Sequence, residues 1–166
     1  MKSETRIELA QVKDAQEIFA LYHGLIDMPY STWDEEYPTM EIVEEDLQHH
    51  HVLAMKDESG AIISAIAVWF EMEFADAAPW YADVKQWCMF CRLGVHRDHQ
   101  GRGIAKRMLT AAMEFGRAHG CDAVQFLVAK SNPIAQRAYA PLGFEVCGEA
   151  ELWEPGEVWL CYQKRL

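Results

Sequence analysis

The fold of this chain is decided by one stretch of sequence, CRLGVHRDHQGRGIAKR at residues 91–107. It closes an apolar run, 87–95, that predicts a β-strand, and it opens a helix in which apolar residues recur at helical spacing up to Phe115. Gly101 and Gly103 lie between the two elements and let the backbone approach a bulky group closely. The first N–H groups of a helix have no internal partner and carry partial positive charge. The stretch therefore predicts an anion site that could hold a phosphorylated cofactor.

The spacing of the glycines narrows the choice of cofactor. A dinucleotide-binding motif would have a third glycine at position 106, which is Lys106, and a P-loop would close on Gly-Lys-Ser/Thr, which is absent. What remains is Gln-x-x-Gly-x-Ala from Gln100 to Ala105, after a strand that ends Leu-x-Val. This pattern resembles the acetyl-CoA pyrophosphate motif of the GNAT superfamily of N-acetyltransferases. Taken alone, it can also be read as a tight strand-to-helix turn that needs small residues for packing.

A second motif follows in the order that the superfamily has. The run NPIAQRAY at 132–139, followed by Leu142-Gly143-Phe144, is similar to the Asn-x-x-Ala…Tyr…Gly-Phe segment of the same superfamily. Proline at the first turn predicts a short helix over 133–140, which Pro141 stops, whereas relatives more often have a polar residue there. Two independent motifs in the correct order are more specific than either alone.

The periodicity of the chain predicts the element order β-α-α-β-β-β-α-β-α-β-β. We expect one N-acetyltransferase domain, 1–166, of α/β class: a GNAT-like mixed, mostly antiparallel sheet with a splayed parallel strand pair, flanked by helices. The predicted strands are 6–10, 51–55, 61–74, 87–95, 123–129, 144–153 and 158–164, and the predicted helices are 14–26, 40–48, 104–119 and 133–140.

The resemblance assigns roles to particular residues. Tyr139 is the expected general acid that protonates the departing CoA thiolate, and Gly94 marks the expected bulge that splays the central strand. A backbone N–H at this bulge could stabilise the oxyanion. The predicted cofactor-binding residues are Leu93 and Val95 through their backbone, the Asn132 amide, and the loop residues Gln100, Gly101, Arg102, Gly103, Ile104 and Ala105.

Alternation along the predicted strand 61–74 places Glu71 and Glu73 on one face at its end. These carboxylates are the candidate general bases, and His23 and Asp76 are the second choices. The alternative is that Glu71 and Glu73 simply face solvent. Trp33 and Tyr37 belong to an acidic aromatic loop, 27–38. Its aromatics are expected either to wall the acceptor site or to fold the loop onto the core.

Composition limits the function classes. The net charge of −11 argues against duplex nucleic acid as a partner and suits either a cationic amine substrate or plain solubility. Neither a signal peptide nor a membrane-length apolar run is present, and five scattered cysteines suit a reducing compartment, so we expect a cytoplasmic protein. The acidic residues of the predicted helix 40–48, Asp46 among them, are expected to form a solvated face. Cys88 and Cys91, three apart in a strand, point to opposite faces and cannot share a metal ion.

We therefore expect an N-acetyltransferase that moves acetyl from acetyl-CoA, as co-substrate and without a metal, to the primary amine of a small molecule. The alternatives are a protein N-terminal or lysine acetyltransferase and a catalytically silent acyl-CoA-binding module. Cys91 is expected to be a bystander, with a covalent acyl relay as the alternative. No nucleic-acid or membrane partner is expected, and edge strands near the C-terminus are consistent with a homodimer.

Overall fold

The computed structural model describes residues 4–71 and 73–166 and confirms the predicted element order. The strands are β1 Arg6–Leu9, β2 His51–Lys56, β3 Ile62–Trp69, β4 Trp87–Val95, β5 Ala123–Ala129, β6 Glu145–Glu151 and β7 Val158–Arg165. The helices are α1 Ala15–His23, α2 Met40–His49, α3 Ile104–Ala118 and α4 Pro133–Tyr139, with short 3-10 turns at Val12–Asp14, Arg97–His99 and Ala140–Leu142.

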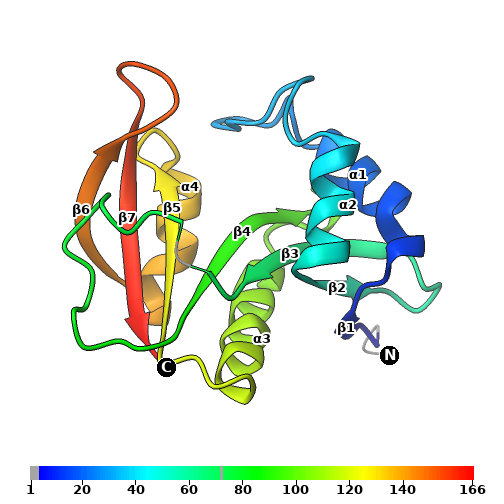
Figure 1. The fold of residues 1–166 in the computed structure, drawn as a ribbon. Coiled ribbons are helices and arrows are strands. Elements are labelled where there is room, and N and C mark those ends of the chain that lie inside the picture. The colour runs from blue at the N-terminus through cyan, green and yellow to red at the C-terminus, as the bar shows by residue number, and fades with distance from the viewer. Residues whose placement is uncertain (1–3, 72) are drawn as a thin grey trace.

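All seven strands form one sheet in the order β1-β2-β3-β4-β5-β7-β6. The β4–β5 pair is parallel and the other neighbouring strands are antiparallel. This is the mixed, mostly antiparallel sheet with one parallel pair that the sequence predicted. Figure 1 shows β4 and β5 meeting at one end and diverging toward the other.

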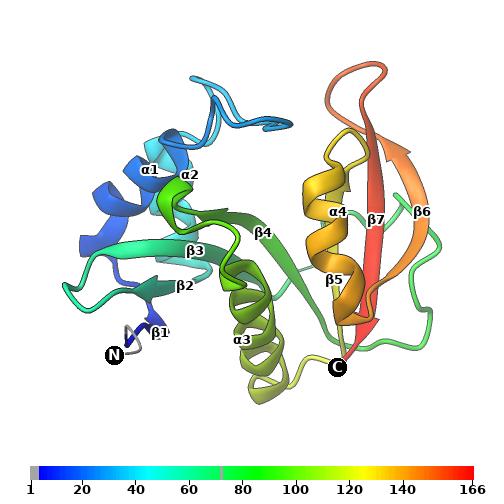
Figure 2. The same cartoon turned by 180° about the vertical axis from the view of Figure 1, so that it is seen from behind.

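The helices cover both faces of this sheet (Figures 1 and 2). One face packs on α3 through a buried cluster that includes Met108 and Leu109, and α4 adds Tyr139 to its edge. The other face packs on α1 and α2 through a cluster that includes Ile18, Tyr22 and Val43. Across the described residues, no helix combines the length and the apolar character needed to cross a lipid bilayer.

The parallel pair is joined along only part of its length. Trp87, Cys88 and Met89 of β4 pair with Ala123, Val124 and Gln125 of β5, and beyond these positions the two strands have no ladder in common. Because the rest of β4 lacks a neighbour on this side, its backbone groups are open to a ligand. The expected splayed pair is thus confirmed.

The predicted strand 61–74 is too long. β3 ends at Trp69, which pairs with Met89 of β4, and the chain then bends away. β2 begins at His51, which pairs with Val68, and β4 begins at Trp87, two residues from Met89, so both neighbouring strands end within two residues of this point. Glu71 and Glu73 are exposed on this bend, so strand alternation no longer places them together, and Met72 lies outside the described residues.

The bulge in β4 lies slightly before the predicted position. Ala65 pairs with Gly94 and Ala67 with Cys91, so β4 holds one extra residue between them. Arg92 takes the left-handed conformation there, with φ 50°. Gly94 itself stays in the ladder, and its missing Cβ leaves room for the Tyr22 ring, whose nearest carbon would be 3.0 Å from such an atom.

Asp14 occupies the N-cap position of α1, but its side chain makes no capping hydrogen bond to this helix. The Asp14 carboxylate accepts the backbone N–H of Gln11 at 2.8 Å, within the 3-10 turn that precedes the helix. Glu17, in the first turn of α1, accepts the backbone N–H of Ile62 at 2.7 Å. Both carboxylates therefore join the N-terminus of α1 to neighbouring backbone through hydrogen bonds.

Candidate active site

The loop before α3 has the conformation that the sequence required. Gly101 and Gly103 both have φ 74°, a left-handed value that side chains rarely adopt. Gly103 is the N-cap residue, and none of the described side chains hydrogen-bonds to this helix end as a cap. The first amides of α3 are therefore available to an anion, and a diphosphate is the group that this geometry suits.

The predicted loop residues contribute in different ways. The Ile104 side chain is buried in the core with α3, so only its backbone can face an anion, and Arg102 is exposed. The Gln100 side chain donates to the Val95 carbonyl at 3.0 Å, which ties the loop to the end of β4. Lys106, also exposed, adds positive charge in the first helical turn.

Tyr139 lies where β4 and β5 have separated. It lines a cavity of about 60 Å³ together with Cys91, Arg92 and Leu93 of β4, Leu127 of β5 and the core residues Ile66, Phe90, Leu109 and Phe126. Its ring packs edge-on against Phe126, with 5.3 Å between ring centroids. Burial, with a smaller contribution from Tyr162, raises the pKa of Tyr139 to about 12. The phenol therefore carries its proton at neutral pH, as a general acid must.

Asn132 caps α4, in addition to its predicted role in cofactor binding. Its Oδ1 accepts the backbone N–H of Ala135 at 3.0 Å and so caps α4. This bond leaves the amide NH₂, rather than the carbonyl oxygen, as the group that could meet the pantetheine arm of a cofactor.

Leu93 and Val95 differ in their freedom to bind through the backbone. Leu93 falls within the bulge and has no register partner on β3, whereas Val95 pairs with Ser64. The Val95 carbonyl also accepts the Gln100 side chain. The unpaired bulge at Arg92–Leu93 is therefore the freer stretch of strand.

The aromatic loop reaches the same region from the α1 side. Trp33 packs edge-on against Tyr22, with 5.1 Å between ring centroids, and belongs to the α1–α2 cluster. The Tyr37 hydroxyl accepts a hydrogen bond from Arg92 Nη1 at 3.0 Å. The two residues thus join the loop to the core and to the bulge of β4. Neither lines the cavity at Tyr139, so their role as a wall of the acceptor site stays a prediction.

The four candidate general bases lie in different surroundings. Glu71 and Glu73 are exposed on the bend after β3, and the charge of Glu73 makes a small contribution to the raised pKa of the Cys91 thiol. His23, by contrast, is hydrogen-bonded to Glu35 at 2.8 Å, where it joins the end of α1 to the loop. Asp76 is exposed. Neither glutamate lines the cavity, so the assignment of the general base stays a prediction.

Cys91 is a thiol at neutral pH. Burial raises its pKa to about 12; smaller influences are Arg92, which lowers the pKa, and Asp46 and Glu73, which raise it. Because the thiolate is the nucleophilic form, this environment disfavours a covalent relay. Cys88 packs in the α3 cluster and Cys91 on the α1–α2 side, which confirms that the two point to opposite faces. No group of three potential metal ligands occurs among the residues described.

The sequence interpretation missed one part of the site. Asp46 is only 1 % exposed, so the prediction of a solvated face is wrong for this residue. Its carboxylate accepts Arg92 Nε at 2.8 Å and Nη2 at 2.5 Å, and also Trp69 Nε1 at 3.0 Å. Spacing could have hinted at this, because Asp46 shares a helix face with the buried Val43 three residues before it. Nothing in the sequence singled out Arg92.

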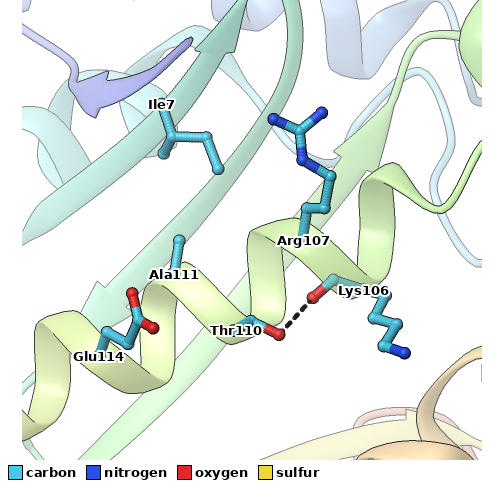
Figure 3. Close-up of a pocket in the computed structure, with 6 residues that line it drawn as sticks. All are labelled: Ile7, Lys106, Arg107, Thr110, Ala111 and Glu114. Carbon is cyan, nitrogen blue, oxygen red and sulfur yellow. Dashed lines mark hydrogen bonds between the residues drawn. The ribbon is translucent and has the colours of Figure 1, made fainter. Parts of the chain in front are cut away.

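A larger surface groove, of about 290 Å³, lies on another side of α3 (Figure 3). It is lined by Ile7 of β1 and by Lys106, Arg107, Thr110, Ala111 and Glu114 of α3. It shares no lining residue with the cavity at Tyr139. The smaller cavity, and not this groove, therefore contains the candidate chemistry.

These features define a class of site. The uncapped end of α3 suits a diphosphate, and the open edge of β4 suits an amide chain. A protonated phenol lies at the gap between β4 and β5. Comparison with known proteins agrees. Residues 18–144 match the Acetyltransferase (GNAT) family, and the chain belongs to this family of acetyltransferases.

Solved structures share the fold over nearly the whole chain. A putative acetyltransferase from Salmonella typhimurium, solved with acetyl-CoA, is 17% identical with a TM-score of 0.73, over 98% of this chain and 94% of the other. The PaiA N-acetyltransferase from Thermoplasma acidophilum, in complex with coenzyme A, is 14% identical with a TM-score of 0.75, over 98% and 99%. The ribosomal-protein-S18-alanine N-acetyltransferase from Escherichia coli is 12% identical with a TM-score of 0.75, over 98% and 94%.

Proposed function

We propose that this protein transfers the acetyl group of acetyl-CoA to the primary amine of a small molecule by direct attack, with Tyr139 as general acid. The observation that carries the proposal is the position of Tyr139, a neutral phenol lining the cavity at the gap between β4 and β5. The uncapped end of α3 supports a diphosphate-bearing acetyl donor.

The residues divide the work of this reaction. The amides at Gly103–Lys106 hold the diphosphate, and the unpaired bulge at Arg92–Leu93 meets the amide chain and the thioester carbonyl. As the amine nitrogen bonds to the acetyl carbon, the carbon–sulfur bond breaks. The departing thiolate takes the proton of Tyr139, and the proton lost by the amine passes to Glu73, directly or through water.

The acceptor side favours a small cationic amine over a protein chain. Trp33 and Tyr37 hold the loop 27–38 against Tyr22 and Arg92, so an aromatic loop lies beside the bulge of β4 that lines the cavity. The carboxylates of Asp34, Glu35, Glu36 and Glu73 add negative charge near this side, which attracts an ammonium group.

An amine panel tests the proposal. Purified protein is incubated with acetyl-CoA and with polyamines, amino acids, aminoglycosides, arylalkylamines and peptides, and free CoA thiol is measured. The expected result is thiol release that depends on a small amine and falls on Tyr139→Phe. Turnover confined to peptides would move the chain to protein acetylation, and binding of acetyl-CoA without turnover of any amine would indicate a silent acyl-CoA-binding module.

A further inference from the structure

The Asp46–Arg92 ion pair is the most deeply buried of the ion pairs between described residues. The side chains of Arg92 and Asp46 are 9% and 2% exposed, and both carboxylate oxygens are used by the guanidinium. Trp69 Nε1 donates to the same carboxylate, and the Arg92 guanidinium lies over the Trp69 ring at 5.6 Å from its centroid. The contacts therefore fix this arginine from several directions.

The pair joins three segments that are distant in sequence. Asp46 belongs to the last turns of α2, Arg92 to the bulge of β4, and Tyr37, which accepts from Arg92 Nη1 at 3.0 Å, to the loop 27–38. A bidentate Arg–carboxylate contact specifies direction as well as distance. Any movement of the bulge would therefore have to break this contact or carry α2 and the loop with it.

The contacts of the Arg92 side chain also hold the backbone of Arg92 in place. Arg92 has φ 50°, a conformation unfavourable for a residue with a Cβ, and it is the extra residue that interrupts the β3–β4 register. Cys91, Arg92 and Leu93 all line the cavity that Tyr139 faces. Without an anchor, this stretch could relax toward a regular ladder with β3, which would turn different backbone groups toward the cavity.

We infer that the Asp46–Arg92 pair is a positioning device: it locks the bulge of β4 in the conformation that presents its backbone groups to the acetyl thioester, and Tyr37 couples the acceptor loop to the same lock. Arg92 acts through its own main chain and is a positioning residue, not a catalytic one. The inference rests on the proposed acetyl transfer from acetyl-CoA.

The test compares Arg92→Lys, which keeps the charge but loses the planar fork, and Asp46→Asn, which removes the carboxylate. A double variant, Asp46→Asn with Arg92→Met, leaves no unpaired buried charge and serves if either single variant fails to fold. The matched control is Asp14→Asn. It breaks the ion pair of Asp14 with Lys56, whose side chains are 10% and 12% exposed, at a site that shares no residue with the cavity.

Three quantities are measured for each variant: the Kd of acetyl-CoA, the kcat and KM for the best amine, and the carbonyl ¹³C shift of bound [1-¹³C]acetyl-CoA. A misplacement of about 1 Å can cost about 100-fold in rate, so we expect kcat to fall by about that factor in the lock variants. The Kd is expected to stay within about twofold, because the diphosphate amides are untouched, and the bound carbonyl shift is expected to change. Asp14→Asn is expected to keep the wild-type kcat and shift.

Several results would overturn the inference. An unchanged kcat in folded Arg92→Lys would do so, and an equal loss in Asp14→Asn would show a general stability effect. A raised KM for the amine with kcat unchanged would make Arg92 an acceptor-binding residue instead. If the wild-type protein binds acetyl-CoA but acetylates no amine, the proposed function fails, and the carbonyl ¹³C shift of bound acetyl-CoA alone decides. A shift that differs from wild type in the lock variants supports the inference, and a shift equal to that of wild type contradicts it.

Discussion

The two ends of the β4–β5 pair differ although they belong to the same two strands. At the closed end, Trp87–Met89 and Ala123–Gln125 pair in register and are almost completely buried. At the open end, the same β4 strand carries a left-handed arginine, an ion pair and a cavity shared with Tyr139. The closed end is part of the buried core, and the proposed chemistry lies where the ladder stops. In the proposed reaction, the backbone that lacks a strand partner at the open end is the part of β4 that binds the thioester.

The largest expected effect is at the open end. Tyr139→Phe removes the proton donor but keeps the ring that packs on Phe126. We expect kcat to fall by about 10²–10⁴-fold, while the Kd of acetyl-CoA and the melting temperature stay near wild type. Steady-state kinetics with calorimetric titration measures both. A variant with full kcat would remove Tyr139 from the mechanism.

At the closed end the expected effect is on stability. Met89→Ala empties a site that is 1% exposed, and such truncations cost about 2–5 kcal/mol in the free energy of unfolding. Because the site lies in the joined part of the pair, kcat per folded molecule is expected to hold within about threefold. Urea denaturation and active-site titration separate the two quantities. A large loss of kcat in folded protein would show that the ends are not independent.

A smaller effect is expected at the phosphate loop. Gly103→Ala strains a residue at φ 74°, and a left-handed side chain costs about 1–2 kcal/mol, so acetyl-CoA should bind about tenfold more weakly. Gly60→Ala, at φ 88° in the β2–β3 turn, is the matched control, because a Cβ at either glycine meets no atom within 4 Å. The control should lose similar stability and no affinity. Equal affinities in both variants would place the diphosphate elsewhere.

The smallest effect is expected at Cys91, and its pH dependence has a definite sign. Burial raises the pKa of this thiol to about 12, so it stays protonated near pH 8 and becomes reactive only as the pH rises toward that value. Cys91→Ala should therefore keep kcat within about twofold, and iodoacetamide should modify Cys91 slowly at pH 8. A burst of acetyl-enzyme that Cys91→Ala abolishes would establish a covalent relay.

The regular elements at both ends of the pair were predictable from sequence. The bounds of β4 and β5 match the predicted runs because mostly apolar residues mark buried strands. The bounds of α3 and α4 agree within one residue because their glycine and proline signals are local. The motif residues Gly101, Gly103 and Tyr139 were predictable for the same reason. Their roles in cofactor binding and catalysis stay predictions.

What could not be predicted depends on contacts between distant segments. The strand predicted over 61–74 ends at Trp69 because its neighbours run out, which no property of Glu71 or Glu73 reveals. Asp46 occurs in a run of acidic residues, and nothing local indicates that it forms a buried ion pair with an arginine 46 positions later. The bulge was expected at Gly94, because the resemblance places it there and a glycine inside a strand is consistent with one, but the left-handed residue is Arg92. A side-chain anchor, not backbone freedom, decides its position.

The central claim is that acetyl-CoA binds at the open end of the β4–β5 pair, with its diphosphate at the first turn of α3. The most direct test is a titration of ¹⁵N-labelled protein with acetyl-CoA, followed by amide NMR shifts. We predict large shifts at Gly101–Lys106 and at Cys91–Val95, with Trp87–Met89 and Ala123–Gln125 nearly unmoved. Shifts confined to the groove that Ile7 and Thr110 line, or no shifts at all, would contradict the claim.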